Sequence, residues 1–347
     1  MSRPSGLVMR LPIELFDMVF QHLRTAELNA FAQTAHFARA MTIQRMYSYI
    51  VFRNSPTNKV LGLLHNLWKN KTLALYVVHL ELDWIGKSDE SVNVASKLAA
   101  VLPMLRNLVH LTVSKAIEIY TWAFDAVTLP SLRELHAHQP LNASFLDRHP
   151  QLRKASIMLP TFGREPYADT NLSELEVLSL INPRGDSNDL LRICSDGNPR
   201  PNLRRIDWQS HGQNLTPSDM TRMQKVASYV RQVNYLDENV AIRNFVLNPP
   251  WESVVRIGLR IPRQTSSSRF FEQHLAGFVR QSCLSFPNIH TVDLLSDSEE
   301  SLSPFQMTTI KRSVKVLRDV HQVLTVTGDG MTYERKGRNG SFVACQR

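Results

Sequence analysis

Leu108-Val109-His110-Leu111-Thr112-Val113 sets the architecture expected of this 347-residue chain. Apolar and polar side chains alternate through its second half, which predicts a short strand with one buried face. The same spacing, apolar-x-x-apolar-x-apolar, recurs about every 20 to 35 residues. Its further copies are Val77-Leu80-Leu82, Leu132-Leu135-Ala137, Leu152-Ala155-Ile157, Leu175-Leu178-Leu180, Leu203-Ile206-Trp208, Val230-Val233-Tyr235, Val254-Ile257-Leu259, Ile289-Val292-Leu294 and a weak last one, Val320-Val323-Thr325.

No single copy can bury its apolar face alone, so neighbouring copies are expected to stack and share one core. Helix signals lie between the strands, at Thr216 to Tyr229, Arg269 to Ser282 and Ser303 to Arg318. The predicted fold class is therefore α/β, an irregular solenoid with parallel strands on its concave face and helices on its convex face. A compact parallel-sheet domain is the alternative. The repetition and the absence of a glycine-rich phosphate loop argue against it.

Three short helices are expected before the first repeat. Pro12 suits the first turn of the first helix, Thr25 suits the N-cap of the second, and a third runs from about Arg39 to Ile50. Apolar residues recur at helical spacing in the first two. Helices this short cannot bury three apolar faces among themselves, so part of that surface is expected to face the rest of the chain or a partner.

The opening Leu11-Pro12-Ile13-Glu14-Leu15, with Val-Phe-x-x-Leu at 19–23 and Leu-x-x-Phe at 28–31, resembles an F-box. The family's tryptophan near the third helix is absent, and Phe37, Tyr47 or Phe52 stands nearest to its place. The repeats resemble the degenerate leucine-rich repeats that often follow an F-box in fungal and plant proteins. The resemblance implies docking onto a Skp-type adaptor and, through it, a cullin scaffold. The adaptor contacts that it implies are Leu11, Pro12, Ile13, Leu15, Val19, Phe20, Leu23, Leu28 and Phe31.

The helical pattern and the repeats divide the chain into four segments. We expect an F-box-like helical module at residues 8–52, a connecting helix or linker at 53–75 and a leucine-rich-repeat-like solenoid at 76–327. The last segment, 328–347, is expected to be a basic C-terminal hairpin or tail. Gly328-Asp329-Gly330 is an ordinary turn signal at its start.

Residues between the buried strand positions are expected to line the concave face, most of them as an ordinary solvated surface. A hypothesis based on charge alone places an acidic or phosphorylated segment of a target protein against three arginines of this face. The candidate target-binding residues are Arg205, Asp207, Gln209, Arg256 and Arg260.

The charge and the apolar composition of the chain limit which classes of partner are expected. The formal net charge is +9, and residues 311–347 contribute a net +5 of it. A solvated basic helix and tail explain this charge better than nucleic-acid contact, because aromatic interleaving and a known motif are absent. No stretch approaches the 18 or so apolar residues of a membrane span, and Met1 to Arg10 is not followed by the apolar run of a signal peptide. Neither a membrane nor secretion is therefore expected.

Signals for metal binding and catalysis are weak. Cys194, Cys283 and Cys345 are isolated, which argues against disulfides and zinc and favours a reducing compartment, the cytoplasm or the nucleus. His136-Ala137-His138 places two imidazoles on one side of a strand, but no third ligand has matching spacing. Gly-x-Ser-x-Gly, Walker and His-Glu-x-x-His motifs are absent. No enzyme activity, metal or cofactor is expected.

The predicted function is that of the substrate-recognition subunit of a Skp–cullin–F-box ubiquitin ligase, with the solenoid holding a protein target. One alternative is a non-ligase leucine-rich-repeat scaffold, in which the F-box-like helices only close the end of the solenoid. The other is a basic nucleic-acid-associated protein that uses the chain after Lys311 and whose binding falls steeply with added salt.

Overall fold

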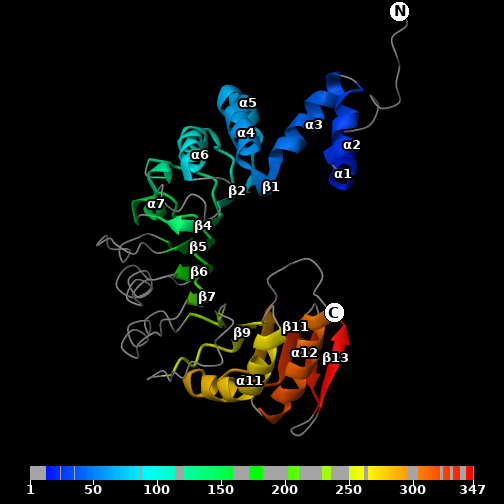
Figure 1. Ribbon diagram of the computed structural model, residues 1–347, viewed down its shortest axis with the longest axis vertical. Coiled ribbons are helices and arrows are strands. Elements are labelled where there is room, and N and C mark those ends of the chain that lie inside the picture. The colour runs from blue at the N-terminus through cyan, green and yellow to red at the C-terminus, as the bar shows by residue number, and fades with distance from the viewer. Residues whose placement is uncertain are drawn as a thin grey trace, which may run out of the picture. The chain divides into compact units, whose positions relative to one another are not determined.

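The protein divides into two compact units, Met1–Leu132 and Arg133–Arg347. Both combine helices with mostly parallel strands, so the α/β class is confirmed (Figure 1). The structure is a computed structural model, and it describes residues 13–23, 25–34, 36–85, 88–113, 121–124, 126–141, 143–158, 172–182, 202–210, 229–235, 250–261, 265–295, 304–320, 323–328, 331–336 and 341–346.

The first unit starts with three short helices, as the sequence predicts: α1 (Ile13–His22), α2 (Thr25–Ala32) and α3 (His36–Ser48). α3 ends before Ile50, its predicted end, because the chain enters strand β1 (Tyr49–Pro56) there. The aromatic and β-branched residues at the start of β1 favour extended backbone. The predicted boundary between residues 52 and 53 therefore falls inside a strand.

Three parallel strands form the sheet of the first unit, in the order β1, β2, β3. Along β2, Leu80, Leu82 and Trp84 are buried and alternate with partly exposed residues, as the repeat pattern predicts. Val60 and Leu64, one turn apart on α4, are fully buried. The remaining elements are β2 (His79–Ile85), β3 (His110–Val113), α4 (Thr57–Lys69), α5 (Lys71–Tyr76), α6 (Ser88–Val101) and the 3-10 turns Leu102–Met104 and Thr121–Phe124.

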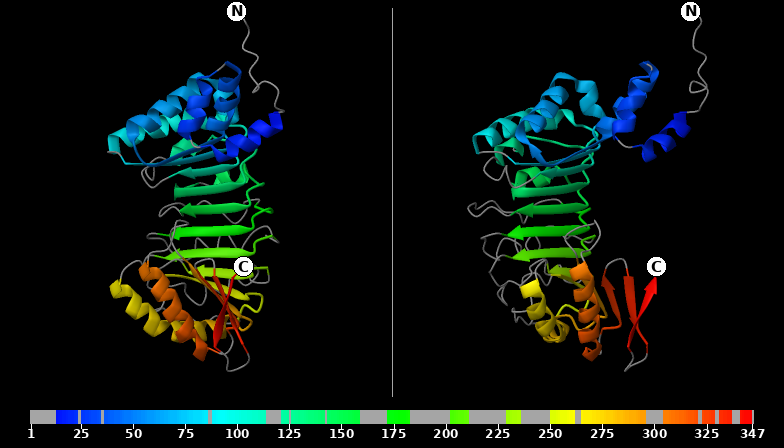
Figure 2. Two further views of the ribbon diagram at one scale, coloured as in Figure 1. Left: turned by 90° about the vertical axis from the view of Figure 1, so that its right-hand side faces the viewer. Right: turned by 45° about the vertical axis from the view of Figure 1, so that its right-hand side comes forward.

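The second unit is a sheet of ten described strands in chain order, seen as side-by-side arrows in Figure 2. β4 to β11 run parallel, and β12 and β13 are antiparallel additions. The second apolar positions of the repeats pair with one another, for example Leu178 with Ile206, so they share one buried face. The strands are β4 (Glu134–Pro140), β5 (Lys154–Met158), β6 (Val177–Asn182), β7 (Arg205–Ser210), β8 (Gln232–Tyr235), β9 (Arg256–Arg260), β10 (Thr291–Leu295), β11 (Thr325–Gly328), β12 (Met331–Arg335) and β13 (Phe342–Gln346).

Two of the predicted helices are confirmed in this unit. They are α11 (Thr265–Ser285) and α12 (Pro304–Val316), the second continued by a 3-10 turn at Leu317–Asp319. A short helix, α7 (Ala143–Asp147), follows β4. Residues 216–228 of the helix predicted from Thr216 to Tyr229 lie outside the described residues, and Tyr229 itself lies in a turn.

The register predicted for the last repeat is wrong. Val326 pairs with Val292, so the copy is Val323-Val326-Gly328 and begins three residues later than the Val320 pattern predicts. A Cβ at Gly328, its third position, would lie 3.3 Å from both Ile310 of α12 and Leu294 of β10, which is a tight contact. The sequence pattern misses this copy because glycine does not count as apolar.

The C-terminal segment is a hairpin, one of the two forms predicted for residues 328–347. β12 pairs antiparallel with β11 on one side and β13 on the other. Arg335 at the end of β12 donates hydrogen bonds to four carbonyl oxygens, those of Leu317, Arg318, Val320 and Val323, at 2.8–3.1 Å. This arginine of the basic tail is therefore engaged within the fold.

Candidate functional site

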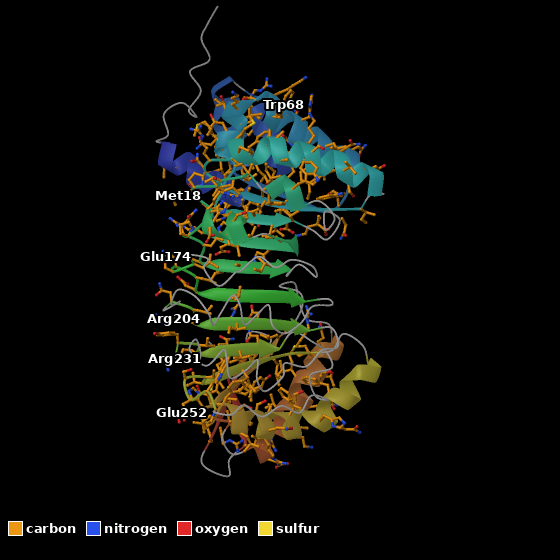
Figure 3. The ribbon with its side chains drawn as sticks, turned by 90° about the vertical axis from the view of Figure 1, so that its left-hand side faces the viewer. Met18, Trp68, Glu174, Arg204, Arg231 and Glu252 are labelled. Atoms are coloured by element: carbon orange, nitrogen blue, oxygen red, sulfur yellow. The ribbon has the colours of Figure 1, made fainter. Side chains whose placement is uncertain are left out.

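An apolar stripe lies exposed on α1. Leu15, Met18 and Val19 are 42%, 60% and 51% exposed. Their spacing of three and four residues places them on one side of the helix. Figure 3 labels Met18 at the surface of α1. We call these three residues the α1 stripe.

The other side of α1 closes a small helical core. Phe20 and Leu28 are buried, with 2% and 7% of their surfaces exposed. The ring of Phe31 meets that of Phe20 nearly edge-on, with 5.4 Å between centroids. The helix is thus held in place by one face while its stripe faces outward. The partly buried residues packed against this core are Leu23, Phe31, Met41 and Met46.

The nine residues expected to contact an adaptor fall into different environments. Met18 is not among them, although its helical spacing from Leu15 is a signal that finds it. The buried members stabilise the helical core, and the exposed ones are the available contacts. Leu15 and Val19 are exposed, Phe20 and Leu28 are buried, Leu23 and Phe31 are partly buried, and Leu11, Pro12 and the side chain of Ile13 lie outside the description.

A chain of polar contacts crosses the second unit, on the face opposite its apolar core. Asp207 of β7 accepts hydrogen bonds from Arg205 Nη2 at 2.9 Å and from Asn234 Nδ2 of β8 at 2.6 Å. Asn234 Oδ1 in turn accepts from Gln232 Nε2 at 2.8 Å. Asp207 and Asn234 are only 7% and 4% exposed, so these bonds replace the water that burial removes.

Asp293 of β10 holds the other end of this chain. Its Oδ2 accepts a hydrogen bond from Gln232 Nε2 at 3.2 Å and lies 2.9 Å from Arg256 Nε in an ion pair. The hydroxyl of Thr327 donates to its Oδ1. The contacts therefore link five consecutive strands, β7 to β11. We call the set the polar ladder: Arg205, Asp207, Gln232, Asn234, Arg256, Asp293 and Thr327.

Gly258 of β9 makes room for the ladder. In register it stands between Asn234 and Asp293. A Cβ at this position would lie 2.2 Å from Asn234 Oδ1 and 2.8 Å from Leu295 Cδ1. Without a side chain on Gly258, Gln232 can reach across β9 to Asp293.

The two carboxylates fix the orientation of both amides. A carboxylate only accepts hydrogen bonds, so Asn234 must turn its NH₂ group toward Asp207. The oxygen of Asn234 then faces the NH₂ group of Gln232, whose second hydrogen is directed to Asp293. The side chains of the ladder are consequently held in one arrangement, with a guanidinium at each carboxylate.

The structure brings three of the five predicted target-binding residues together: Arg205, Asp207 and Arg256. Arg260 lies at the end of β9, half-buried and opposite Leu295. Gln209 belongs to β7, but its side chain lies outside the description. The face is less solvated than predicted, because its carboxylates lie under their neighbours. The ladder members that the prediction omits are Gln232, Asn234, Asp293 and Thr327, which strand alternation places on this face without showing which of them meet.

Charged residues of both signs stand just before the strands, and we call them the rim. The backbone carbonyl of each rim residue accepts a hydrogen bond from the N–H of the next rim residue; for example, Arg231 N–H donates to the carbonyl oxygen of Arg204 at 2.8 Å. Figure 3 shows Glu174, Arg204, Arg231 and Glu252 along this edge. The rim residues in the backbone row are Arg133, Arg153, Glu176, Arg204 and Arg231.

The histidines that the structure describes lie in different environments. His136 of β4 is exposed, and the side chain of His138 lies outside the description. His149 is fully buried, and its Nδ1 lies 2.6 Å from the carbonyl oxygen of Phe145. Burial is the main cause that lowers the pKa of His149. Within the described ranges, no three acidic, histidine or cysteine side chains gather as a metal site.

None of the described helices has the length and apolarity that crossing a bilayer requires. No protein-family model matches the chain, and no protein of curated function matches it significantly.

Proposed function

We propose that this protein is a substrate-recognition subunit of a Skp–cullin–F-box ubiquitin ligase. Its helices α1 to α3 dock on a Skp-type adaptor, and the polar face of its second unit binds the target protein. The observation that carries the proposal is the α1 stripe: Leu15, Met18 and Val19 are exposed on a helix whose opposite face closes a core. The F-box-like sequence around this stripe supports an adaptor as its partner.

Burial of the α1 stripe is expected to supply the docking energy. A fully buried aliphatic side chain contributes about 1.5 to 3 kcal/mol relative to an exposed one. Leu15, Met18 and Val19 retain roughly half of their exposure, so covering them contributes about 1 kcal/mol each. Phe20 is already buried and gains nothing from a partner. The docking energy therefore belongs to the stripe rather than to the core residues of the same motif.

The contribution to ubiquitin transfer is proximity. A receptor that holds the target beside a charged ubiquitin-conjugating enzyme makes the transfer effectively intramolecular. The chain itself is proposed to supply no catalytic group, and the polar ladder binds rather than reacts.

The test is co-expression with a Skp-type adaptor, followed by affinity capture. Leu15→Asp/Val19→Asp places two charges in the stripe and is expected to abolish capture. Val92→Asp is the matched control, because Val92 is an exposed valine (39%) on α6 of the same unit. Capture should survive in that control. If the double variant captures as much adaptor as the wild-type protein does, the proposed docking surface is contradicted.

The scaffold alternative has a distinct outcome in the same experiment. If the folded wild-type protein captures no adaptor, the helices are an end cap and the ligase proposal fails. Circular dichroism of the purified wild-type chain establishes that it is folded.

A further inference from the structure

We propose that the polar ladder binds an extended acidic segment of the target, with two carboxylate side chains three residues apart on Arg205 and Arg256. The inference rests on the target-binding half of the proposed function and is independent of the adaptor. Arg205, Gln232 and Arg256 pair in register and form one row across β7, β8 and β9.

The carboxylates of the ladder lie deeper in the protein than its guanidinium groups. The side chains of Asp207 and Asp293 are each only 10% exposed, whereas those of Arg205 and Arg256 are 41% and 38% exposed. The negative groups thus lie beneath and the positive groups project above them. The two positive and two negative charges sum to zero, but an approaching partner first contacts the guanidinium N–H groups. Such a surface is complementary to an anion.

The buried carboxylates position the two arginines. Asp207 holds Arg205 through Nη2, and Asp293 lies beside Nε of Arg256. A guanidinium has five N–H donors, so each arginine keeps donors for a partner. Two parallel N–H groups match the two oxygens of a carboxylate. Because the aspartates already fix both side chains, binding costs less side-chain entropy.

Lys154 of β5 occupies the same register position farther along the sheet, and its charge is neutralised locally. Lys154 Nζ lies 2.7 Å from Glu134 Oε1, and that glutamate is 24% exposed. A partner at this end of the sheet meets both charges. The arginine pair differs because its carboxylates are deeper. The anion is therefore assigned to β7 to β9 rather than to β4 and β5.

The spacing of the arginines suggests the conformation of the segment. Neighbouring strands are about 4.8 Å apart, so Arg205 and Arg256, two strands apart, are separated by about 9.6 Å at the backbone. A polyproline II segment has three residues per turn and rises about 3.1 Å per residue. Residues three apart then lie on one side, about 9.3 Å from each other. Two acidic residues at that spacing can meet both arginines.

The experiment uses the purified full chain without an adaptor. The probe is a fluorescein-labelled proline-rich peptide with two aspartates three residues apart, and binding is measured by fluorescence anisotropy. The control peptides carry two asparagines at the same positions, or two aspartates one residue apart. We expect the first peptide to bind at least about tenfold more tightly than either control, and added salt to weaken it.

Protein variants locate the site. Arg205→Gln/Arg256→Gln is expected to weaken the aspartate peptide at least about tenfold. Lys315→Gln, which removes an exposed charge from α12, should leave its affinity unchanged. If the glutamine variant does not fold, the variant Arg205→Lys/Arg256→Lys tests the site instead. It keeps a cation beside each aspartate but loses the planar fork, so binding should fall several-fold.

Three results overturn the inference: equal affinity for the asparagine and aspartate peptides, undiminished binding in the folded glutamine variant, or undiminished binding in the lysine variant. A phosphoserine peptide that binds where the aspartate peptide does not also overturns the assignment to carboxylates. None of these results depends on adaptor capture, so the failure of this inference and the failure of the ligase proposal are distinguishable.

Discussion

Arg335 Nε donates a hydrogen bond of 2.8 Å to the carbonyl oxygen of Val323 and so joins the C-terminal hairpin to the last repeat. Its two terminal nitrogens donate to three more carbonyls at the end of the preceding helical segment. A positive charge is favourable at a helix C-terminus, where carbonyl groups lack partners. The ring of Phe342 lies 4.8 Å from the guanidinium carbon and adds a cation–π contact.

Replacing Arg335 should destabilise the second unit. Arg335→Gln removes four charge-assisted hydrogen bonds whose energies are not additive, since they share one partly exposed side chain, and should lower the free energy of unfolding by about 2 to 4 kcal/mol in total. Urea denaturation followed by circular dichroism measures the change. Lys336→Gln removes an exposed charge beside it and should change stability by less than about 0.5 kcal/mol. Equal effects of the two substitutions would refute the structural role of Arg335.

A methyl group at Gly258 should disrupt the polar ladder. In Gly258→Ala the new Cβ would collide with Asn234 Oδ1, so we expect a loss of about 1 to 3 kcal/mol. Gly277→Ala is the matched control, because this helical glycine of α11 has open space around its Cβ position. That substitution should stabilise by up to about 1 kcal/mol. Thermal denaturation distinguishes the destabilisation expected for Gly258→Ala from the stabilisation expected for Gly277→Ala. A Gly258→Ala variant with unchanged stability would contradict the polar ladder.

The core and the surface of helices α1 to α3 should respond differently to substitution. Phe20→Ala removes a buried ring and should destabilise the local helical unit by about 3 to 5 kcal/mol. Leu15→Asp alters an exposed position and should leave amide hydrogen exchange in α2 and α3 unchanged. Exchange measured by mass spectrometry reports both effects. Rapid exchange of α2 in the Leu15 variant would mean that the stripe is part of the core.

Stability should fall on acidification through His149. Burial lowers its pKa below the ordinary 6.5, so in mild acid the unfolded chain binds a proton that the folded chain resists. Stability is therefore full above about pH 6.5 and is lost as pH falls below it toward the folded-state pKa. We expect the free energy of unfolding, measured by urea denaturation, to decrease as the pH is lowered from about 6.5. His149→Gln should reduce this dependence, whereas His274→Gln, at an exposed position, should not.

Much of the sheet could be predicted from the sequence because one face of each strand is buried. The alternating apolar residues identify β2 to β10 directly, as with Leu111 and Val113 in β3. The pattern fails where this link breaks. β1 carries the same spacing, in which Ile50 pairs with Leu80 and Phe52 with Leu82, but the helix predicted from Arg39 to Ile50 overlaps its start. Gly328 stands where the other copies have an apolar residue, close to Ile310.

The candidate sites could be predicted only in part. Alternation places Arg205 and Asp207 on the polar face, but their partners depend on which side chains reach across strands. The reach of Gln232 past Gly258 is a three-dimensional property with no local sequence signal. On α1, the family pattern names core and surface residues together, because both Phe20 and Val19 are apolar. Only burial separates them.

Amide hydrogen exchange of the full chain, with and without a purified Skp-type adaptor, tests the central claim most directly. We expect a stable complex in which the amides of α1, residues 13–22, exchange more slowly, while those of β7 to β9 are unaffected. Absence of a complex, or a complex that leaves α1 unprotected, would contradict the account.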